Sequence, residues 1–82
     1  MVVYSRPGCH LCEEAVAAIA ALHGDGYRFE LREIDIDSDD LLLRRYLERI
    51  PVVEVDGTEV SELVLDQAAL RGRLDTVGAW SR

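Results

Sequence analysis

Two cysteines three positions apart, Cys9 and Cys12, are the side chains of this 82-residue chain best suited to chemistry, and the sequence contains no other cysteine. A Pro-Gly pair precedes them and favours a turn, and the alanine-rich residues 13–22 after them have high helix propensity. Side chains at positions i and i+3 near a helix start lie on one face, at about the 4.4–6.8 Å Cα separation that a disulfide requires. The spacing therefore predicts a pair that closes and opens a disulfide without rearranging the chain.

The two thiols are expected to differ in reactivity. Free N–H groups and the positive end of the helix dipole meet at the first turn of a helix, so they favour a thiolate at Cys9. A free cysteine has a pKa of about 8.5, whereas cysteines of Cys-x-x-Cys motifs at helix starts have values of roughly 3.5–7.5. Cys12 lies one turn further along the helix, so its thiolate is stabilised less by these groups. We therefore predict thiol–disulfide exchange in which Cys9 is the nucleophile and Cys12 the resolving cysteine.

Two other uses of the pair are open at this point. Buried, unreactive cysteines occur in small protein cores. Cys9, His10 and Cys12 are also potential metal ligands, but a four-coordinate zinc site needs a fourth, and His23 lies about 20 Å away along a continuous helix. We therefore expect no metal site within one chain, while a metal cluster that bridges two chains is kept as an alternative.

The charged side chains near the pair each have two interpretations. His10 either stabilises the Cys9 thiolate when it is protonated or points to solvent. Arg6 either contacts the substrate or is a solvated loop charge. The carboxylates of residues 35–40 could suggest a cation site, but they lack the full ligand pattern of an EF-hand and are better explained as a strand end and a helix cap.

Composition narrows the class of protein. The formal net charge is −7, and all nine basic residues are arginines, so we expect no nucleic-acid binding, which depends on neutralising phosphates. The sequence has no apolar run of about 18 residues, so we expect no membrane span. We also expect no signal peptide, because no basic and apolar leader pattern is visible before the first strand-like segment. These features favour a cytoplasmic protein, where a Cys-x-x-Cys is more often catalytic or metal-binding than structural.

Alternating strands and helices are expected to position the cysteines. Strands are predicted at residues 1–4, 27–37, 52–55 and 58–64, and helices at residues 11–23, 37–50 and 66–77. In the first helix, Val16, Ile19, Ala20 and His23 are expected to form the inner face, with Ala15 and Leu22 at its edges. The order β-α-β-α-β-β-α predicts an α/β fold with a four-stranded mixed sheet flanked by three helices. We expect a single domain over residues 1–77 and a C-terminal tail at residues 78–82.

Three motifs resemble those of a known family. They are Arg-Pro-Gly-Cys-His-Leu-Cys at residues 6–12, Ile-Asp-Ile-Asp-Ser-Asp at residues 34–39, and Ile-Pro-Val-Val at residues 50–53. Together they resemble a small bacterial glutaredoxin-like family of the thioredoxin superfamily, over residues 2 to about 74. The resemblance implies a thioredoxin-like fold and an oxidoreductase that takes part in electron transport through a redox-active disulfide.

The resemblance also implies roles for particular residues. Cys9 matches the nucleophilic cysteine and Cys12 the resolving one. Pro51 matches the cis-proline that faces the pair in this superfamily, and the backbone of Ile50 matches the segment that pairs with the substrate chain. Arg6 matches a basic residue that often holds a carboxylate of glutathione.

The chain departs from the glutaredoxin pattern in three places, one of which is Arg49-Ile50-Pro51, where glutaredoxins usually carry Thr-Val-Pro. His10 and Leu11 replace the usual Pro and Tyr between the cysteines, and we expect both to line the substrate site. Residues 59–66 read EVSELVLD, where glutaredoxins have a Gly-Gly segment that cradles the γ-glutamyl end of glutathione. The carboxylates in this segment predict a poorer site for a tripeptide that itself carries two carboxylates. Glutathione is therefore kept only as a candidate co-substrate, and we expect no bound cofactor.

These expectations combine into one function and one alternative. We expect a monomeric thiol–disulfide oxidoreductase acting on a disulfide-containing protein or a small thiol substrate. Its reductant would be glutathione or a system of the thioredoxin-reductase type. The alternative is a non-catalytic redox module or a cluster-carrying binding module on the same fold.

Overall fold

The computed structural model describes residues 1–78, so the predicted tail lies, apart from Gly78, outside the described residues. Four short strands form one sheet in the order β2-β1-β3-β4. The elements in chain order are β1 (Val2–Ser5), α1 (His10–Gly24), β2 (Arg32–Asp35), the 3-10 helix η1 (Ile36–Ser38), α2 (Asp40–Tyr46), β3 (Val52–Val55), β4 (Thr58–Ser61) and α3 (Gln67–Thr76). The predicted order of strands and helices is confirmed, with η1 as an addition.

The sheet is mixed, as predicted. β1 pairs in parallel with β2, beginning at Val2 opposite Arg32, and in antiparallel fashion with β3. β3 and β4 form a hairpin around Asp56 and Gly57, whose φ angles of 51° and 77° are both positive. Two positive φ angles suit the twist of a two-residue hairpin, which explains why Asp-Gly is a strong signal for it.

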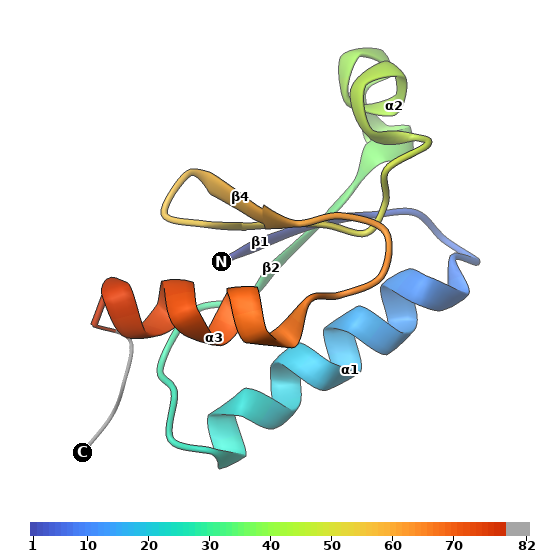
Figure 1. Ribbon diagram of the computed structural model, residues 1–82. Coiled ribbons are helices and arrows are strands. Elements are labelled where there is room, and N and C mark those ends of the chain that lie inside the picture. The colour runs from blue at the N-terminus through green and yellow to red at the C-terminus, as the bar shows by residue number, and fades with distance from the viewer. Residues whose placement is uncertain (79–82) are drawn as a thin grey trace.

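Helices cover both faces of the sheet. Figure 1 shows α1 and α3 together on one side of the strands and α2 on the other side. The side chains of a strand alternate between the two faces, so Val3 packs with α1 and α3, whereas Tyr4 packs on the side of α2. Both β1 and β3 therefore contribute side chains to the two halves of the core, since Val52 and Val53 divide between them as Val3 and Tyr4 do.

The larger core cluster lies between the sheet and the pair α1 and α3. Its buried members are Val3, Ile19, Leu22, Tyr27, Val53, Val55, Leu70 and Leu74. The smaller cluster lies under α2 and contains Ile36, Tyr46 and Val52. In it the rings of Tyr4 and Tyr46 stack with their centroids 4.3 Å apart. Burial of these apolar side chains supplies the main driving force that holds the helices on the sheet.

The second strand is shorter than predicted. We expected a strand over residues 27–37, but β2 contains only Arg32–Asp35. Because β1 begins at Val2, which is opposite Arg32, the ladder between β1 and β2 starts at Arg32, and Tyr27 forms only an isolated bridge outside β2. At its other end, β2 stops because the chain enters η1 at Ile36, whose side chain is buried in the smaller cluster.

The second helix and the fourth strand are also shorter than predicted. α2 ends at Tyr46, and the N–H groups of Arg49 and Ile50 both donate to the Tyr46 carbonyl in the turn that leads to Pro51. A residue that precedes proline avoids the helical conformation, so the helix cannot continue to residue 50. β4 ends at Ser61 and not at residue 64, since Leu63 adopts a left-handed φ of 61° and the chain leaves the sheet.

The inner face of the first helix is rotated from the predicted one. Its buried residues are Cys12, Ala15, Ile19 and Leu22, whereas Ala20 and His23 are exposed and Val16 is half-buried. In an alanine-rich helix two overlapping sets of apolar residues can each form an inner face, and the sequence pattern alone does not show which set is buried. The observed face has a consequence for the site, because it turns Cys12 towards the core.

None of the helices in residues 1–78 combines the length and the apolar character that crossing a bilayer requires.

Two leucines test the packing of α3. Leu70 is 0% exposed in the larger cluster, so Leu70→Ala leaves a cavity and should lower the free energy of unfolding by about 2–5 kcal/mol. Leu41 is 75% exposed on α2, and Leu41→Ala should change that free energy by less than about 0.5 kcal/mol. Urea unfolding followed by circular dichroism measures both values. Equal losses in the two variants would contradict the described packing of α3 on the sheet.

Candidate functional site

A tight loop connects β1 to α1 and places the first cysteine at the helix start. The loop closes with a hydrogen bond of 3.2 Å from the Cys9 N–H to the Arg6 carbonyl. Gly8 has a φ of 79°, a left-handed value that glycine adopts without steric cost. Cys9 itself has extended backbone angles, and its carbonyl accepts the first helical hydrogen bond from Glu13, 3.1 Å long. Cys9 is therefore the N-cap of α1.

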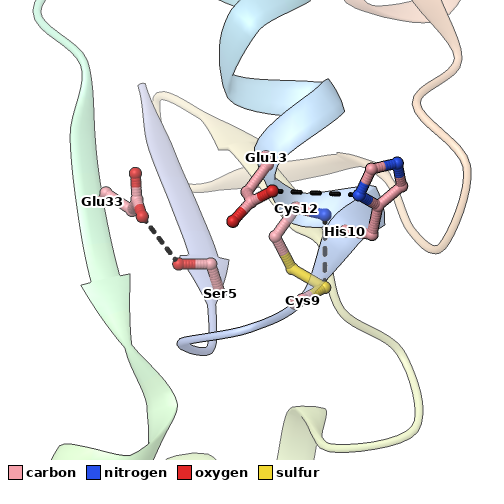
Figure 2. Close-up of a disulfide and its surroundings, with 6 residues drawn as sticks. All are labelled: Ser5, Cys9, His10, Cys12, Glu13 and Glu33. Atoms are coloured by element: carbon pink, nitrogen blue, oxygen red, sulfur yellow. Dashed lines mark hydrogen bonds and ion pairs between the residues drawn. A yellow bond between two sulfur atoms is a disulfide. The ribbon is translucent and has the colours of Figure 1, made fainter.

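The two cysteines form a disulfide across the first turn of α1 (Figure 2). Their Cα atoms are 5.2 Å apart, within the range that the i and i+3 spacing predicts. The Cys12 N–H also donates to the Cys9 sulfur over 3.2 Å, so the sulfur occupies the capping position that an oxygen usually fills. A thiolate at Cys9 would accept this hydrogen bond more strongly than a thiol does.

The two cysteines differ in exposure. Cys12 is 3% exposed because it lies on the inner face of α1, whereas Cys9 is half-buried at the end of the helix. A disulfide or thiol partner arriving from solvent can reach Cys9 more readily. Exposure and position thus both favour Cys9 as the sulfur that meets a partner first, which agrees with the role predicted from the sequence.

A cavity of about 530 Å³ adjoins the disulfide on the side of β2. The loop and the helix contribute both cysteines, Arg6 and Glu13 to its lining, while the sheet contributes Ser5, Glu33 and Asp35. Ser5 is buried, and its hydroxyl donates to Oε1 of Glu33 over 3.1 Å (Figure 2).

Sequence reasoning missed Ser5 and Glu33 as part of the site. Ser5 is the first polar residue after the apolar strand, which was an available signal. Nothing in the sequence, however, aligned β1 with β2. The parallel register places Ser5 opposite Asp35 and thereby brings the carboxylates of β2 beside the cysteines.

His10 lies on the outer side of the first turn. Its side chain is 83% exposed, with Nδ1 3.9 Å from Oε2 of Glu13 (Figure 2) and Nε2 3.3 Å from Oε1 of Glu14. These contacts are ion pairs only when the imidazole is protonated. Leu11 follows it and is also exposed. This geometry favours the interpretation in which the imidazole faces solvent.

Arg6, which lines the cavity, and Arg49, which directly precedes the Ile50–Pro51 segment, are both paired within the chain. Nε of Arg6 lies 3.0 Å from Oδ1 of Asp37, on an exposed surface. Arg49 forms ion pairs with both Glu59 and Glu62. The hydrogen bond to Glu62 is the main cause that raises the pKa of the Arg49 guanidinium above its usual value, and the charges of Glu59 and Glu62 add to it.

The second loop of the predicted site contains the expected proline. The Ile50–Pro51 peptide bond is cis, as the resemblance implied. Pro51 is buried, and Ile50 packs against the smaller core cluster. The Leu63 N–H donates to the Arg49 carbonyl over 3.0 Å, so this loop is tied to the segment after β4. Contact of Ile50 and Pro51 with a substrate stays a prediction.

The carboxylates of residues 35–40 act as helix caps. Oδ1 of Asp35 accepts from the Asp37 N–H in η1, and Oδ1 of Asp39 accepts from the Leu41 N–H at the start of α2. The capping residue of α2 is therefore Asp39, one or two positions later than expected. Across residues 1–78, no three His, Cys, Asp or Glu side chains are grouped as metal ligands would be.

Comparisons with known proteins agree on one kind of domain. A family model described as "Glutaredoxin-like domain (DUF836)" matches residues 1–75. The solution NMR structure of protein Ne2328 from Nitrosomonas europaea is 39% identical with a TM-score of 0.77, over 88% of this chain and 86% of that chain. The X-ray structure of protein XcR50 from X. campestris is 33% identical with a TM-score of 0.74, over 92% and 95% of the respective chains. No curated protein matches the chain.

The exposure of the two thiols predicts their order of reaction with an alkylating agent. After reduction, Cys9 should react with limiting iodoacetamide about tenfold faster than Cys12 or more, because it is accessible and its thiolate is favoured at the helix start. Fragmentation mass spectrometry of the peptide that contains both cysteines locates the label on Cys9 or Cys12 and so measures both rates. In urea, where α1 is unfolded, the two rates should converge. Faster modification of Cys12 in the folded protein would contradict the described burial.

Proposed function

Because the chain belongs to the glutaredoxin-like domain family and has a thioredoxin-like fold, we propose that it is a thiol–disulfide oxidoreductase acting through Cys9 and Cys12. The single observation that carries the proposal is the pair at the start of α1, bonded across one helical turn with Cys9 outermost. A disulfide in that position can open and close while the rest of the fold stays in place.

The oxidative half of the reaction transfers two electrons from the dithiol to a substrate disulfide. The Cys9 thiolate attacks one sulfur of the substrate, forms a mixed disulfide, and releases the other half as a thiolate that takes a proton from water. Cys12 then attacks Sγ of Cys9, so that the Cys9–Cys12 bond forms and the second substrate thiolate leaves. The proton lost by Cys12 goes to that departing thiolate.

The local structure supports each role. The Cys12 N–H and the dipole of α1 stabilise negative charge on Cys9, both when it attacks and when it leaves. Cys12 is shielded from solvent, so a substrate meets Cys9 first and the resolving step is intramolecular. An intramolecular attack across 5.2 Å of Cα separation is fast compared with release by a second molecule.

The reductive half needs an external thiol. Either two molecules of glutathione or one protein dithiol would return two electrons to the Cys9–Cys12 disulfide. We place the protein in the cytoplasm as a monomer, where such reductants are available. Residues Arg6, His10, Leu11, Ile50 and Pro51 are proposed to line the approach of the substrate.

Serine variants of the two cysteines test this mechanism. Cys12→Ser should retain attack by Cys9 but trap the mixed disulfide, which intact-protein mass spectrometry detects as an adduct. Cys9→Ser should form no adduct under the same conditions, because the buried thiol of Cys12 is poorly accessible. The opposite pattern, with an adduct only on Cys9→Ser, would reverse the two roles.

Equilibration of the wild-type protein with reduced and oxidised glutathione tests the redox function itself. A two-electron transition between dithiol and disulfide, without a lasting adduct, is expected for a dithiol oxidoreductase served by a protein reductant. A stable glutathione adduct on Cys9 would instead assign glutathione as co-substrate. A pair that never closes would refute the proposal, and a coloured, dimeric preparation would favour a cluster-carrying module.

A further inference from the structure

The charges around the disulfide indicate which substrates the site takes. Resting on the function proposed above, we propose that the site selects disulfides whose flanking groups are positively charged and discriminates against anionic disulfides such as oxidised glutathione. Four features of the described residues support this inference: the lining of the cavity, the pairing of two arginines, the use of backbone donors after β4, and the carboxylate on the outer side of the first turn.

The cavity beside the disulfide carries excess negative charge. Three carboxylates, those of Glu13, Glu33 and Asp35, line it together with one guanidinium, that of Arg6. The three carboxylates line the same cavity as the two cysteines, and Figure 2 draws Glu13 between Glu33 and the cysteine pair. The hydroxyl of Ser5 donates to Glu33 but carries no charge, so it orients this carboxylate without neutralising it.

Arg6, which lines the cavity, and Arg49, which directly precedes the Ile50–Pro51 segment, already bind carboxylates of the chain. Nε of Arg6 contacts Oδ1 of Asp37 at 3.0 Å, and Nε of Arg49 contacts Oε2 of Glu62 at 2.6 Å. Arg49 also pairs with Glu59, so its single positive charge faces two negative ones. Each guanidinium has further N–H donors, but its charge is already offset by an internal carboxylate, so an anionic substrate gains less free energy from it than from an unpaired arginine.

Backbone donors after β4 are occupied in the same way. The Leu63 N–H donates to the Arg49 carbonyl over 3.0 Å, and the Asp66 N–H donates to the Ser61 hydroxyl over 2.9 Å. The Asp66 carboxylate caps α3 by accepting from the Ala69 N–H over 3.0 Å. A carboxylate therefore already occupies the helix start at which a carboxylate of a ligand could otherwise bind.

The outer side of the first turn of α1 is also negatively charged, like the cavity, and it has apolar surface as well. A second hollow on this side is lined by Glu14 together with Leu11 and Val64. Both apolar side chains are exposed, and Val64 is 72% exposed. Carboxylates thus flank the first turn on both sides, next to surface that suits an aliphatic chain. A lysine or arginine side chain has this combination of an apolar stem and a cationic end.

Three small disulfides of different charge test the selectivity. The reduced protein is mixed with cystamine, a dication, with the neutral bis(2-hydroxyethyl) disulfide, and with the dianion 3,3′-dithiodipropionate, and the second-order rate of thiol loss is measured. The ratio of the cystamine rate to the dianion rate is divided by the same ratio for a blocked Cys-His-Leu-Cys peptide, which lacks the fold. At low ionic strength we expect this normalised ratio to be about ten or more. The preference should fall steeply at about 1 M salt, where the Debye length is about 3 Å.

Charge-removing variants assign the preference to the site. Glu13→Gln/Glu33→Gln removes two charges of the cavity and keeps the acceptor for Ser5, so it should reduce the ratio of the two rates at least threefold. A ratio is used because any change in the nucleophilicity of Cys9 affects both substrates alike. The matched control Glu30→Gln/Asp56→Asn removes two charges near the opposite end of β1, where both residues line a hollow together with Met1, and should leave the ratio unchanged.

The outcomes separate this inference from the function on which it rests. Reaction with all three disulfides but a normalised ratio near one, or in favour of the dianion, would overturn the charge selectivity and leave the oxidoreductase proposal standing. An equal loss of preference in the control variant would also overturn it. No reaction with any disulfide would refute the proposed function and the selectivity together.

A second arm distinguishes a small substrate from a polypeptide. Two short peptides joined by one disulfide, with lysines or with glutamates beside the cysteines, are compared with cystamine at equal concentration. The lysine peptide should react faster than the glutamate peptide, and the reverse order would overturn the selectivity. If the lysine peptide also reacts faster than cystamine, the result supports a polypeptide substrate that contacts Leu11 and Val64. If cystamine is the faster, the selectivity is supported for a small cationic disulfide.

Discussion

The packing of α1 against the sheet is the constraint on which the site depends. Ala15, Ile19 and Leu22 bury the inner face of the helix, and this fixes its rotation about its own axis. Cys12 lies on that face and is therefore buried, while Cys9, as the N-cap, lies at the end of the helix where solvent reaches it. The same apolar contacts that stabilise the fold thus make the two sulfurs unequal, which is the property that ordered disulfide exchange requires.

Electrostatics around the pair follow from the same arrangement. The helix start offers an N–H and a dipole that favour a thiolate, whereas the carboxylates of Glu13 and Glu33 oppose it. Negative charge near a reactive sulfur has a second effect, because it acts on every ion that approaches. Arg6 and Arg49 do not offset this effect, since each is paired with at least one carboxylate of the chain. The environment of the sulfurs therefore bears on substrate choice as well as on reactivity.

Predictions from the sequence succeeded where the signal was local and were less accurate where the structure depends on distant partners. The Asp56–Gly57 hairpin, the disulfide spacing and the order of elements were all correct, because each depends on residues close in the chain. The length of β2 was wrong because a strand extends only as far as its neighbour β1 does. The inner face of α1 was wrong because alanines blur the boundary between an apolar stripe and its flanks.

The sequence by itself determined the cysteine pair, the turn before it and the helix that begins at it, since turn and helix preferences act over a few residues. Tertiary structure decided what surrounds the pair. Ser5 meets Glu33 across 28 residues of sequence, and Arg49 meets Glu62 across 13. Such contacts depend on strand register and loop closure, which are properties of the whole packed chain. The reactive groups could therefore be identified from the sequence, whereas the charge of their surroundings required the fold.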